Sequence, residues 1–527
     1  MRRRRWAIAA VAAAAVCAAL CAVALLAWPR VDLDAADVAL ARVALPHFAG
    51  RVTAVTVSSP TGQPIPVQLR HDDLWPQRKL VAGESLTVQL TVRRPSWAGW
   101  LVGHTQRHSF AIVTPSVHLL GRWLQVQTGS PVTVAFDAPV EMISLRDLPA
   151  RALSTPRAVV PVGVVASGSR SAGTIKVAAS ARPWERLSAP LQVSWFPARP
   201  YPQLLAEPRS EGRLAPGGPL TLTFSRPIQD VLGTARPRVS PSTPGHWRLV
   251  DAHTLAFQPS GLGFPFGEQV RLMLPVAVHL AGQPGAILTR TLHWQVPQGS
   301  TLRLQQLMAQ LGYLPLAWNP TGRDVQTLTA ELGAAVSPPA GRFVWRYPRL
   351  RTMLGSLWQP GQYTVMVQGA VMAFEADHGL TSDGVVESQV WADLLGAAVK
   401  HQADRLPYDC IEVSEGSPEA LSVWRAGRIV YSTPCNTGIV ARPTAFGTFP
   451  VYARYLSTTM TGTNPDGSHY SDPGVPYVAY FNGGDAVHGF PRLGYGWPQS
   501  LGCVELPYSA AAVVFNYDPI GTLVGVS

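Results

Sequence analysis

The chain has 527 residues, too many for one hydrophobic core; at roughly 100–200 residues per domain, three to five domains are expected. Hydrophobic residues make up 47% and charged residues 14% of the chain, which excludes a mostly disordered protein. The net charge of +11 would suit anionic lipid, an acidic wall polymer or nucleic acid. Because no basic stripe is interleaved with aromatic residues, nucleic acid is the weakest of these partners and is not expected.

Residues 1–29 predict a cytoplasmic arginine cluster followed by a transmembrane anchor. Four arginines at 2–5 precede an uncharged apolar segment, residues 6–28. As a helix, this segment would be about 34 Å long, enough to cross a hydrocarbon layer of about 30 Å. The positive-inside rule would then make a single-pass protein of the cell membrane with residues 30–527 outside. A cleaved signal peptide is the alternative, although the apolar segment is long for one and no clear cleavage site follows Trp28.

The sequence from residue 30 to 299 is typical of β domains. The phrase "GGPLTLTFSRPI" (217–228) alternates apolar and polar residues, as a half-buried strand does. A matching phrase, "GSPVTVAFDAPV" (129–140), lies one domain length earlier. We therefore predict two Ig-like β-sandwiches at 115–200 and 201–299, after a β domain at 30–114. A stalk or spacer is the simplest role for them.

Residues 300–400 predict a small all-α domain. In "TLRLQQLMAQLGYLP" (301–315) the apolar residues recur at helical spacing, and "VQGAVMAFEADHGLTSDGVVESQVWADLL" (367–395) predicts two helices joined by a turn. These phrases resemble the three-helix peptidoglycan-binding domain of cell-wall hydrolases, except that residues 316–366 form an insertion. The resemblance implies wall binding, but the same apolar residues would form the core of any helical domain.

Five cysteines are too few for a disulfide scaffold. Cys17 and Cys21 lie in the apolar N-terminal segment and lack the small preceding residue of a lipoprotein signal. Cys410 and Cys435 flank a predicted hairpin, "ALSVWRAGRIVY", and could form a disulfide in an exported protein. Cys503 would then be the one free extracytoplasmic thiol, and such a leftover thiol is a candidate for reactivity.

A histidine and this cysteine bracket a loop-like segment, "HGFPRLGYGWPQSLGC" (488–503). A free thiol with a pKa near about 8.5 is mostly unreactive at neutral pH, and a nearby imidazolium can lower that pKa. His488 could act as the base, with the Gly489 carbonyl holding its other ring nitrogen, and Cys503 as the nucleophile. Gly502 permits a tight turn that could aim the amides of Gly502 and Cys503 at a developing oxyanion.

The surrounding phrases resemble the L,D-transpeptidase catalytic domain of the YkuD type. "NTGI…RPTAFGTF" (436–449), "YFNGGDAVHG" (480–489), "SLGCVELP" (500–507) and "PIGTLVGV" (519–526) occur in the order of that family, so residues 405–527 are predicted to form a mainly β catalytic domain. Ser500, Gly502 and Cys503 fall on the family motif, whereas Leu501 stands where a histidine is usual. The resemblance implies His488, Gly489 and Cys503 as catalytic groups.

The resemblance also implies the reaction and its partners. Cys503 would attack a peptidoglycan stem peptide after its third residue, expel a terminal D-amino acid, and pass the acyl group to an amine of a neighbouring stem. This acyl transfer would form a 3→3 cross-link in the bacterial cell wall, and carbapenems would acylate the cysteine. Two alternatives remain open: a wall-binding scaffold that lost activity, with Leu501 as the mark of the loss, and an L,D-carboxypeptidase that uses water.

Other candidate residues carry weaker signals. Tyr480, Phe481 and Asp485 could shape the substrate cleft, although core packing explains the two aromatic residues equally well. Met460 and Tyr470 lie in a polar, turn-rich segment, 457–477, which we interpret as a long connection that could cover the site. No HExxH or comparable ligand pattern is present in the sequence, so neither a metal nor a cofactor is expected.

Overall fold

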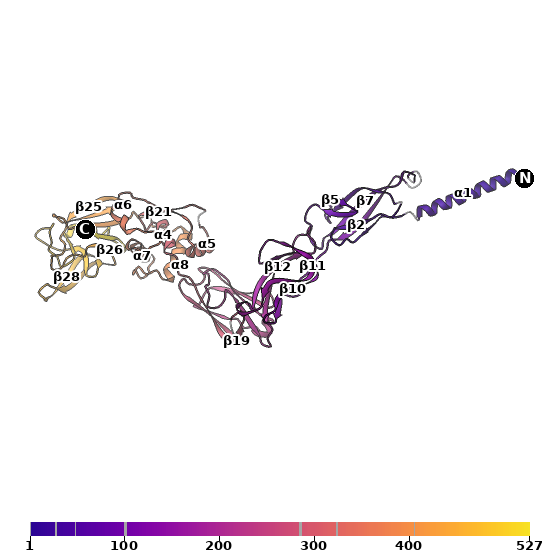
Figure 1. Cartoon of the computed structure of the whole chain (residues 1–527). Helices are drawn as coiled ribbons and strands as arrows, with labels where there is room; N and C mark the ends of the chain where they lie inside the picture. Colours follow the sequence, from indigo (N-terminus) through magenta and orange to yellow (C-terminus); the bar gives the residue numbers. More distant parts are fainter. Residues whose placement is uncertain are drawn as a thin grey trace. The chain divides into compact units, whose positions relative to one another are not determined.

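The computed structural model describes residues 2–26, 29–47, 49–97, 99, 103–283, 287–322, 325–404 and 406–527. Two compact units are present: residues 1–205 with 223–226 and 278–288, and residues 206–222, 227–277 and 289–527. The chain is mainly β with several separate sheets, and most of its helices lie between residues 301 and 400 (Figure 1). Trp28, the last residue of the predicted apolar segment, and Arg405, the first residue of the predicted catalytic domain, lie outside the described residues.

The N-terminal segment forms helix α1 (Arg2–Leu26). Across the described ranges, no helix combines the length and the apolar character needed to cross a membrane. The predicted transmembrane anchor therefore has no support from the structure.

Residues 30–114 form two four-stranded sheets around one apolar core. The sequence of strand β7 explains how this core forms. Every second residue is apolar and buried, namely Leu86, Val88, Leu90 and Val92, and polar residues alternate with them. One sheet has the order β1-β2-β6-β5, from β1 (Asp32–Asp34), β2 (Ala41–Ala44), β5 (Val67–Arg70) and β6 (Asp73–Pro76). The other has the order β4-β3-β7-β8, from β3 (Arg51–Ser58), β4 (Pro64–Ile65), β7 (Ser85–Arg93) and β8 (Thr105–Val113).

Residues 115–200 contain a five-stranded sheet with the order β11-β10-β12-β13-β9. Its strands are β9 (Trp123–Val126), β10 (Pro131–Leu145), β11 (Arg151–Val165), β12 (Gly173–Ser180) and β13 (Leu191–Pro197), with the 3-10 helix η1 (Gly168–Arg170) between β11 and β12. Two separate sheets were predicted here. The structure instead has one, because β10 is interrupted by bulges and pairs with β11 over most of its length and with β12 at its end.

The following strands form a seven-stranded sheet with the order β16-β19-β14-β15-β18-β17, in which β20 also pairs with β19. Its elements are β14 (Gln203–Glu207), β15 (Leu220–Phe224), α3 (Ile228–Val231), β16 (Arg238–Ser240), β17 (Gly245–Leu249), β18 (Thr254–Pro259), β19 (Gln269–Leu280) and β20 (Ile287–Gln295). The two matching sequence phrases lie on β10 and β15. In both, the predicted apolar face is buried: Val132, Val134 and Phe136, and Leu220, Leu222 and Phe224.

Residues 300–400 are helical but not all-α, so that part of the prediction is wrong. The helices are α4 (Thr301–Gln310), α5 (Leu328–Val336), α6 (Leu350–Leu354), η2 (Gly355–Leu357), α7 (Val365–Asp377) and α8 (Ser388–Lys400). The insertion contributes an antiparallel hairpin of β21 (Leu316–Pro320) and β22 (Gly341–Trp345). Trp318 and Phe343 pack across this hairpin with ring centroids 4.8 Å apart, which gives the two strands an apolar face to bury.

The C-terminal residues form two sheets around a shared apolar core. The first has the order β25-β24-β23-β31-β26, from β23 (Asp409–Ser414), β24 (Ala420–Arg425), β25 (Arg428–Pro434), β26 (Gly447–Pro450) and β31 (Leu523–Val526). The second has the order β27-β28-β29-β30, from β27 (Ala453–Thr463), β28 (His469–Asn482), β29 (Asp485–Gly489) and β30 (Val504–Leu506). Helix α9 (Tyr508–Val514) contributes Ala510, Ala511 and Val514 to the same core.

The segment 457–477 is a β-hairpin rather than the irregular connection that we predicted. Strands β27 and β28 stay paired as far as Thr463 and His469, and a short turn joins them. The Asn464 amide donates to the Ser468 carbonyl across this turn, and Asp466 accepts from both the amide and the hydroxyl of Ser468. The polar residues of this segment thus form the turn between the two strands.

The helical region packs directly against the catalytic region. Cys410 on β23 and Leu523 on β31 belong to the same buried cluster as Val367, Val371 and other residues of α7. Both regions lie in the second compact unit. The helices therefore pack against two inner strands of the first C-terminal sheet, β23 and β31.

The predicted disulfide between Cys410 and Cys435 is wrong, because both thiols are free and buried. Cys410 is level with Trp424 on β24, whereas Cys435 follows Pro434, which is level with Ala420. The two cysteines are thus about five residues apart along the sheet, or ~16 Å at ~3.3 Å per residue. A disulfide needs Cα atoms within about 7 Å.

Candidate active site

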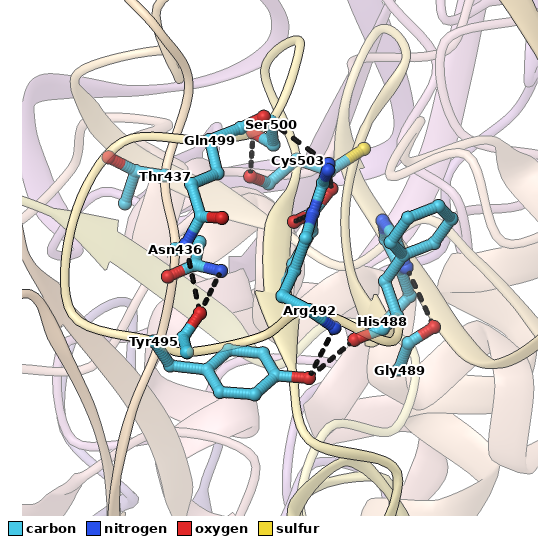
Figure 2. A network of polar contacts seen from close by, with 12 residues as sticks. Asn436, Thr437, His488, Gly489, Arg492, Tyr495, Gln499, Ser500 and Cys503 are labelled. Carbon is cyan, nitrogen blue, oxygen red and sulfur yellow. Dashed lines mark hydrogen bonds and ion pairs between the residues drawn. The ribbon is translucent and has the colours of Figure 1, made fainter.

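Parallel pairing of two short strands brings His488 and Cys503 to the same face of one sheet. Strands β29 and β30 pair with Val487 level with Val504 and His488 level with Glu505. Cys503 immediately precedes β30, so by this register it is level with Ala486, which lies two residues before His488 on the same face of β29. Both residues line a cleft of about 780 Å³. Figure 2 shows them with the polar network around them.

His488 is buried and held through its Nδ1 atom. This nitrogen lies 3.1 Å from the Gly489 carbonyl oxygen, and when it carries the proton it donates to that oxygen (Figure 2). Nε2 is then unprotonated and able to accept a proton. Burial lowers the pKa of His488 below its usual range; the Gly489 carbonyl and Glu505 oppose that shift, whereas Arg492 adds to it. The imidazole is therefore neutral at neutral pH.

The Cys503 thiol is also neutral in the resting site. Its Sγ atom lies 3.6 Å from the Gly484 carbonyl oxygen, to which the thiol donates. Burial raises the pKa of Cys503 to about 12; the Ala486 amide opposes this, and the charges of Asp485 and Glu505 contribute to it. We predicted that His488 would lower this pKa. The resting structure contradicts this, because a neutral imidazole supplies no charge to stabilise a thiolate.

The turn before the nucleophile is fixed by Ser500. Its buried Oγ donates to the Cys503 carbonyl at 2.5 Å and accepts from the Gly502 amide at 3.2 Å. Its backbone is held from the other side, because its amide donates to the Thr437 carbonyl and its carbonyl accepts from the Ile439 amide. Since Ser500 already occupies the Gly502 amide, the predicted use of that amide as an oxyanion donor does not hold in this state.

The backbone conformation at position 502 requires glycine. Its φ is +123°, and a Cβ atom there would collide with Oδ1 of Asp485. Leu501, half-buried, lines the cleft between Ser500 and this glycine.

An ion pair beside His488 is the feature that the sequence analysis missed. The Arg492 guanidinium binds Glu505 through Nε and Nη2, both at 2.7 Å, and Nη2 also donates to the Gln499 carbonyl at 3.2 Å. Glu505 is only 4% exposed and is level with His488 in the strand register. Arg492 lies four residues after His488, and Glu505 lies two residues after Cys503. The opposite charges of these two residues, both within the motif segments, could have predicted the ion pair.

The loop between the base and the nucleophile is held by further hydrogen bonds (Figure 2). The Tyr495 hydroxyl donates to the Phe490 carbonyl at 2.6 Å and accepts from the Arg492 amide at 3.3 Å. The Gly494 carbonyl accepts from the side-chain amides of Gln499 and Asn436. A glycine-rich loop is thereby kept in one shape.

The structure brings four of the five weaker candidates to the cleft. Met460, Tyr470, Tyr480 and Asp485 all line it. Burial raises the pKa of Asp485, whose Oδ2 accepts from the Ala445 amide at 3.1 Å. Phe481 does not reach the cleft: strand residues alternate between faces, and its ring lies in the core, 6.1 Å from that of Phe449 between centroids.

Several solved L,D-transpeptidase structures are similar to parts of this chain. The L,D-transpeptidase from Mycobacterium smegmatis is 13% identical, covering 62% of this chain and 99% of its own, with a TM-score of 0.21. L,D-transpeptidase 3 from Mycobacterium tuberculosis is also 13% identical, covering 62% of this chain and 98% of its own, with a TM-score of 0.21. The catalytic domain of the E. faecium L,D-transpeptidase is 27% identical over 24% of this chain and 100% of its own, with a TM-score of 0.22. No curated protein matches the sequence.

One family model matches, and it coincides with the two sheets that carry His488 and Cys503. The match begins at the first residue of β23 and ends at the last residue of β31. It does not extend to residues 300–400, so the resemblance of that region to a peptidoglycan-binding domain gains no support from it. Residues 409–526 of this chain are an L,D-transpeptidase catalytic domain of the YkuD family.

Proposed function

We propose that the protein is a peptidoglycan L,D-transpeptidase that forms 3→3 cross-links between stem peptides. The observation that supports the proposal is that β29 and β30 bring His488, held through Nδ1 by the Gly489 carbonyl, and the Cys503 thiol to one cleft. A general base and a nucleophile in this arrangement suit acyl transfer from an amide.

In the acylation step, Nε2 of His488 takes the Cys503 proton while Sγ attacks the carbonyl carbon of the third stem residue. Because both groups start neutral, proton transfer and attack are coupled, and no thiolate has to accumulate beforehand. The carbon–nitrogen bond then breaks, and His488 returns the proton to the departing amine of the terminal D-amino acid. A thioester on Cys503 remains.

In the second step an amine of a neighbouring stem attacks the thioester carbonyl. The carbon–sulfur bond breaks, the sulfur recovers a proton through His488, and the new amide is the cross-link. Water in place of the amine would give an L,D-carboxypeptidase, so the ratio of transfer to hydrolysis distinguishes these two activities.

Intact mass after incubation with a carbapenem tests the proposal. The wild type should gain the mass of one carbapenem, Cys503→Ala should gain none, and Cys435→Ala, which loses a buried thiol away from the cleft, should behave as the wild type does. His488→Ala should slow acylation at neutral pH at least ~100-fold, the lower range for general acid–base catalysis. Acylation of Cys503→Ala would place the nucleophile elsewhere.

The same measurement tests the inactive-scaffold alternative, which rests on Leu501. The hydrogen bonds that fix this turn come from Ser500 and from the backbone, and Leu501 contributes no polar group to them. We therefore expect Leu501→His to change the acylation rate less than about tenfold, or ~1.4 kcal/mol in barrier. An unreactive wild type with a reactive Leu501→His would establish the scaffold instead.

The proposed substrate lies outside the cytoplasm, so we also propose that the domains after residue 30 are extracytoplasmic, at the cell wall. Protease added to intact protoplasts should digest them while a cytosolic marker survives. Survival of both proteins would refute this location.

A further inference from the structure

The face of the β27–β28 hairpin that borders the cleft carries one carboxylate. Met460 and Gly462 on β27 are level with Asp472 and Tyr470 on β28, and all four line the cleft. Tyr470 and Asp472 are two residues apart on one strand and therefore share this face. Gly462 leaves room for the Tyr470 ring, because a Cβ atom there would collide with the Tyr470 hydroxyl group.

Most charges in the cleft are already satisfied. Arg492 and Glu505 neutralise each other, and Asp485 accepts from the Ala445 amide. Among the residues that the structure describes, neither Asp472 nor Arg442 forms an ion pair or a side-chain hydrogen bond. The cleft therefore offers one unpaired anion and one unpaired cation to a ligand.

The Asp472 carboxylate lies within electrostatic range of His488, the proposed base. Its charge raises the pKa of His488 and of Tyr470, and it acts in the same direction on Arg492. It is partly exposed, on a strand that reaches from the cleft wall toward the hairpin turn. A cation bound to Asp472 would thus lie in the same cleft as Cys503.

We propose that Asp472 binds the ammonium group of the acceptor stem, the group that attacks the thioester. This inference rests on the proposed transpeptidase function. The third residue of either stem carries a side-chain amine, and in the acceptor this cationic amine is the group that has to reach the thioester; the donor also brings the carboxylate of its terminal residue. An unpaired carboxylate therefore complements the acceptor, and the unpaired guanidinium of Arg442 complements the donor.

The proton balance of the step is consistent with this role. The bound ammonium has three protons on nitrogen, and the amide product retains one. One of the two released protons passes through His488 to the Cys503 sulfur as the carbon–sulfur bond breaks, and the other goes to solvent. Asp472 holds the ammonium in the cleft until the first proton leaves, after which the neutral amine is free to attack.

Measuring the two half-reactions separately tests Asp472. A stem tetrapeptide as donor gives the acyl-enzyme, followed by intact mass, and a stem tripeptide with a side-chain amine serves as acceptor. Asp472→Asn should lower kcat/KM for the acceptor at least tenfold more than it lowers the acylation rate, mainly through KM, because a hydrogen bond to a charged group is lost. Hydrolysis should rise at the expense of transfer, and Asp472→Glu should recover part of the acceptor affinity.

Asp393→Asn, on the exposed side of α8, makes the same change in net charge away from the cleft and should leave both half-reactions as in the wild type. An unchanged acceptor KM in Asp472→Asn would overturn the inference while leaving the proposed function intact. Equal losses in acylation and transfer would also overturn it, because Asp472 would then act on His488. Failure of the wild type to form an acyl-enzyme would remove the proposed function, and the inference with it.

Discussion

The resting Cys503 is expected to react slowly with small alkylating reagents, and its rate should keep rising with pH. The thiolate is the reacting species, so the rate follows its population. With the pKa raised to about 12 from the ordinary 9.0, the thiolate fraction at pH 8 falls from about one in ten to about one in ten thousand. Burial supplies this shift, so a solvent-exposed peptide thiol should react up to ~1000-fold faster.

Iodoacetamide and intact mass measure this rate directly between pH 6 and pH 10. Cys503→Ala identifies which adduct belongs to the cleft, and the buried Cys410 and Cys435 provide an internal reference within the same chain. The rate should rise about tenfold per pH unit and show no plateau below pH 10. His488→Ala should change this profile little, because a neutral imidazole contributes no charge to the resting thiol.

A plateau with a midpoint below pH 8 would refute this reasoning. It would show that the resting pair is a thiolate and an imidazolium. In that case His488→Ala would shift the midpoint of the pH profile upward. Proton transfer would precede substrate binding in that case, and the coupled acylation step proposed above would have to be abandoned.

Two further variants test the surroundings of the site, and a third tests Glu375, a buried carboxyl group on α7 that accepts from the Gly384 amide. Glu505→Gln removes the charged partner of the partly exposed Arg492 and should lower stability by roughly 1.5–3 kcal/mol, the range for hydrogen bonds to charged groups, and slow carbapenem acylation at least tenfold. Unchanged unfolding and acylation would show that the ion pair is dispensable. Gly502→Ala places a Cβ against Asp485 at a φ of +123° and should cost about 1–3 kcal/mol in denaturant unfolding, whereas a neutral effect would mean that this turn relaxes freely. Burial raises the pKa of Glu375 to about 7 from 4.5, so the folded state favours the protonated carboxyl and stability falls as the pH rises from 4.5 to 7. Glu375→Gln should remove up to ~3 kcal/mol of this pH dependence. If the two proteins gave identical unfolding curves at both pH 5 and pH 8, this reasoning would be wrong.

Local sequence patterns predicted the elements that depend on near neighbours. The helical spacing of Leu304, Leu307 and Met308 predicted α4, and the alternation around Leu220 predicted β15, because burial on one face is encoded within a few residues. The segment 316–366 has no such long periodic pattern. Its hairpin depends on Trp318 meeting Phe343 from a distant part of the chain, which local spacing does not reveal.

The errors at the site have the same origin. The Cys410–Cys435 pairing was inferred from sequence separation, but the register of β23, β24 and β25 places the two residues at opposite ends of the sheet. The environment of Cys503 depends on Gly484 and Ala486, which a strand on the other side of the loop supplies. Identity of the nucleophile is a local property of the motif, whereas its pKa is a property of the folded neighbourhood.

The charge arrangement in the cleft gives a physical interpretation of Leu501, which stands where a histidine is usual in the family. Cys503 and His488 are both neutral at rest, and the one strong charge pair beside them, Arg492 with Glu505, is closed on itself. A leucine at position 501 adds no titratable group to this wall, so the unpaired charges of the cleft are confined to Arg442 and Asp472. A site of this kind has no ionised nucleophile to react with small electrophiles, and its reactivity depends on a substrate whose carbonyl is brought to Cys503. Under the proposed function, the two unpaired charges would select the substrate, and the two neutral groups would carry out the reaction.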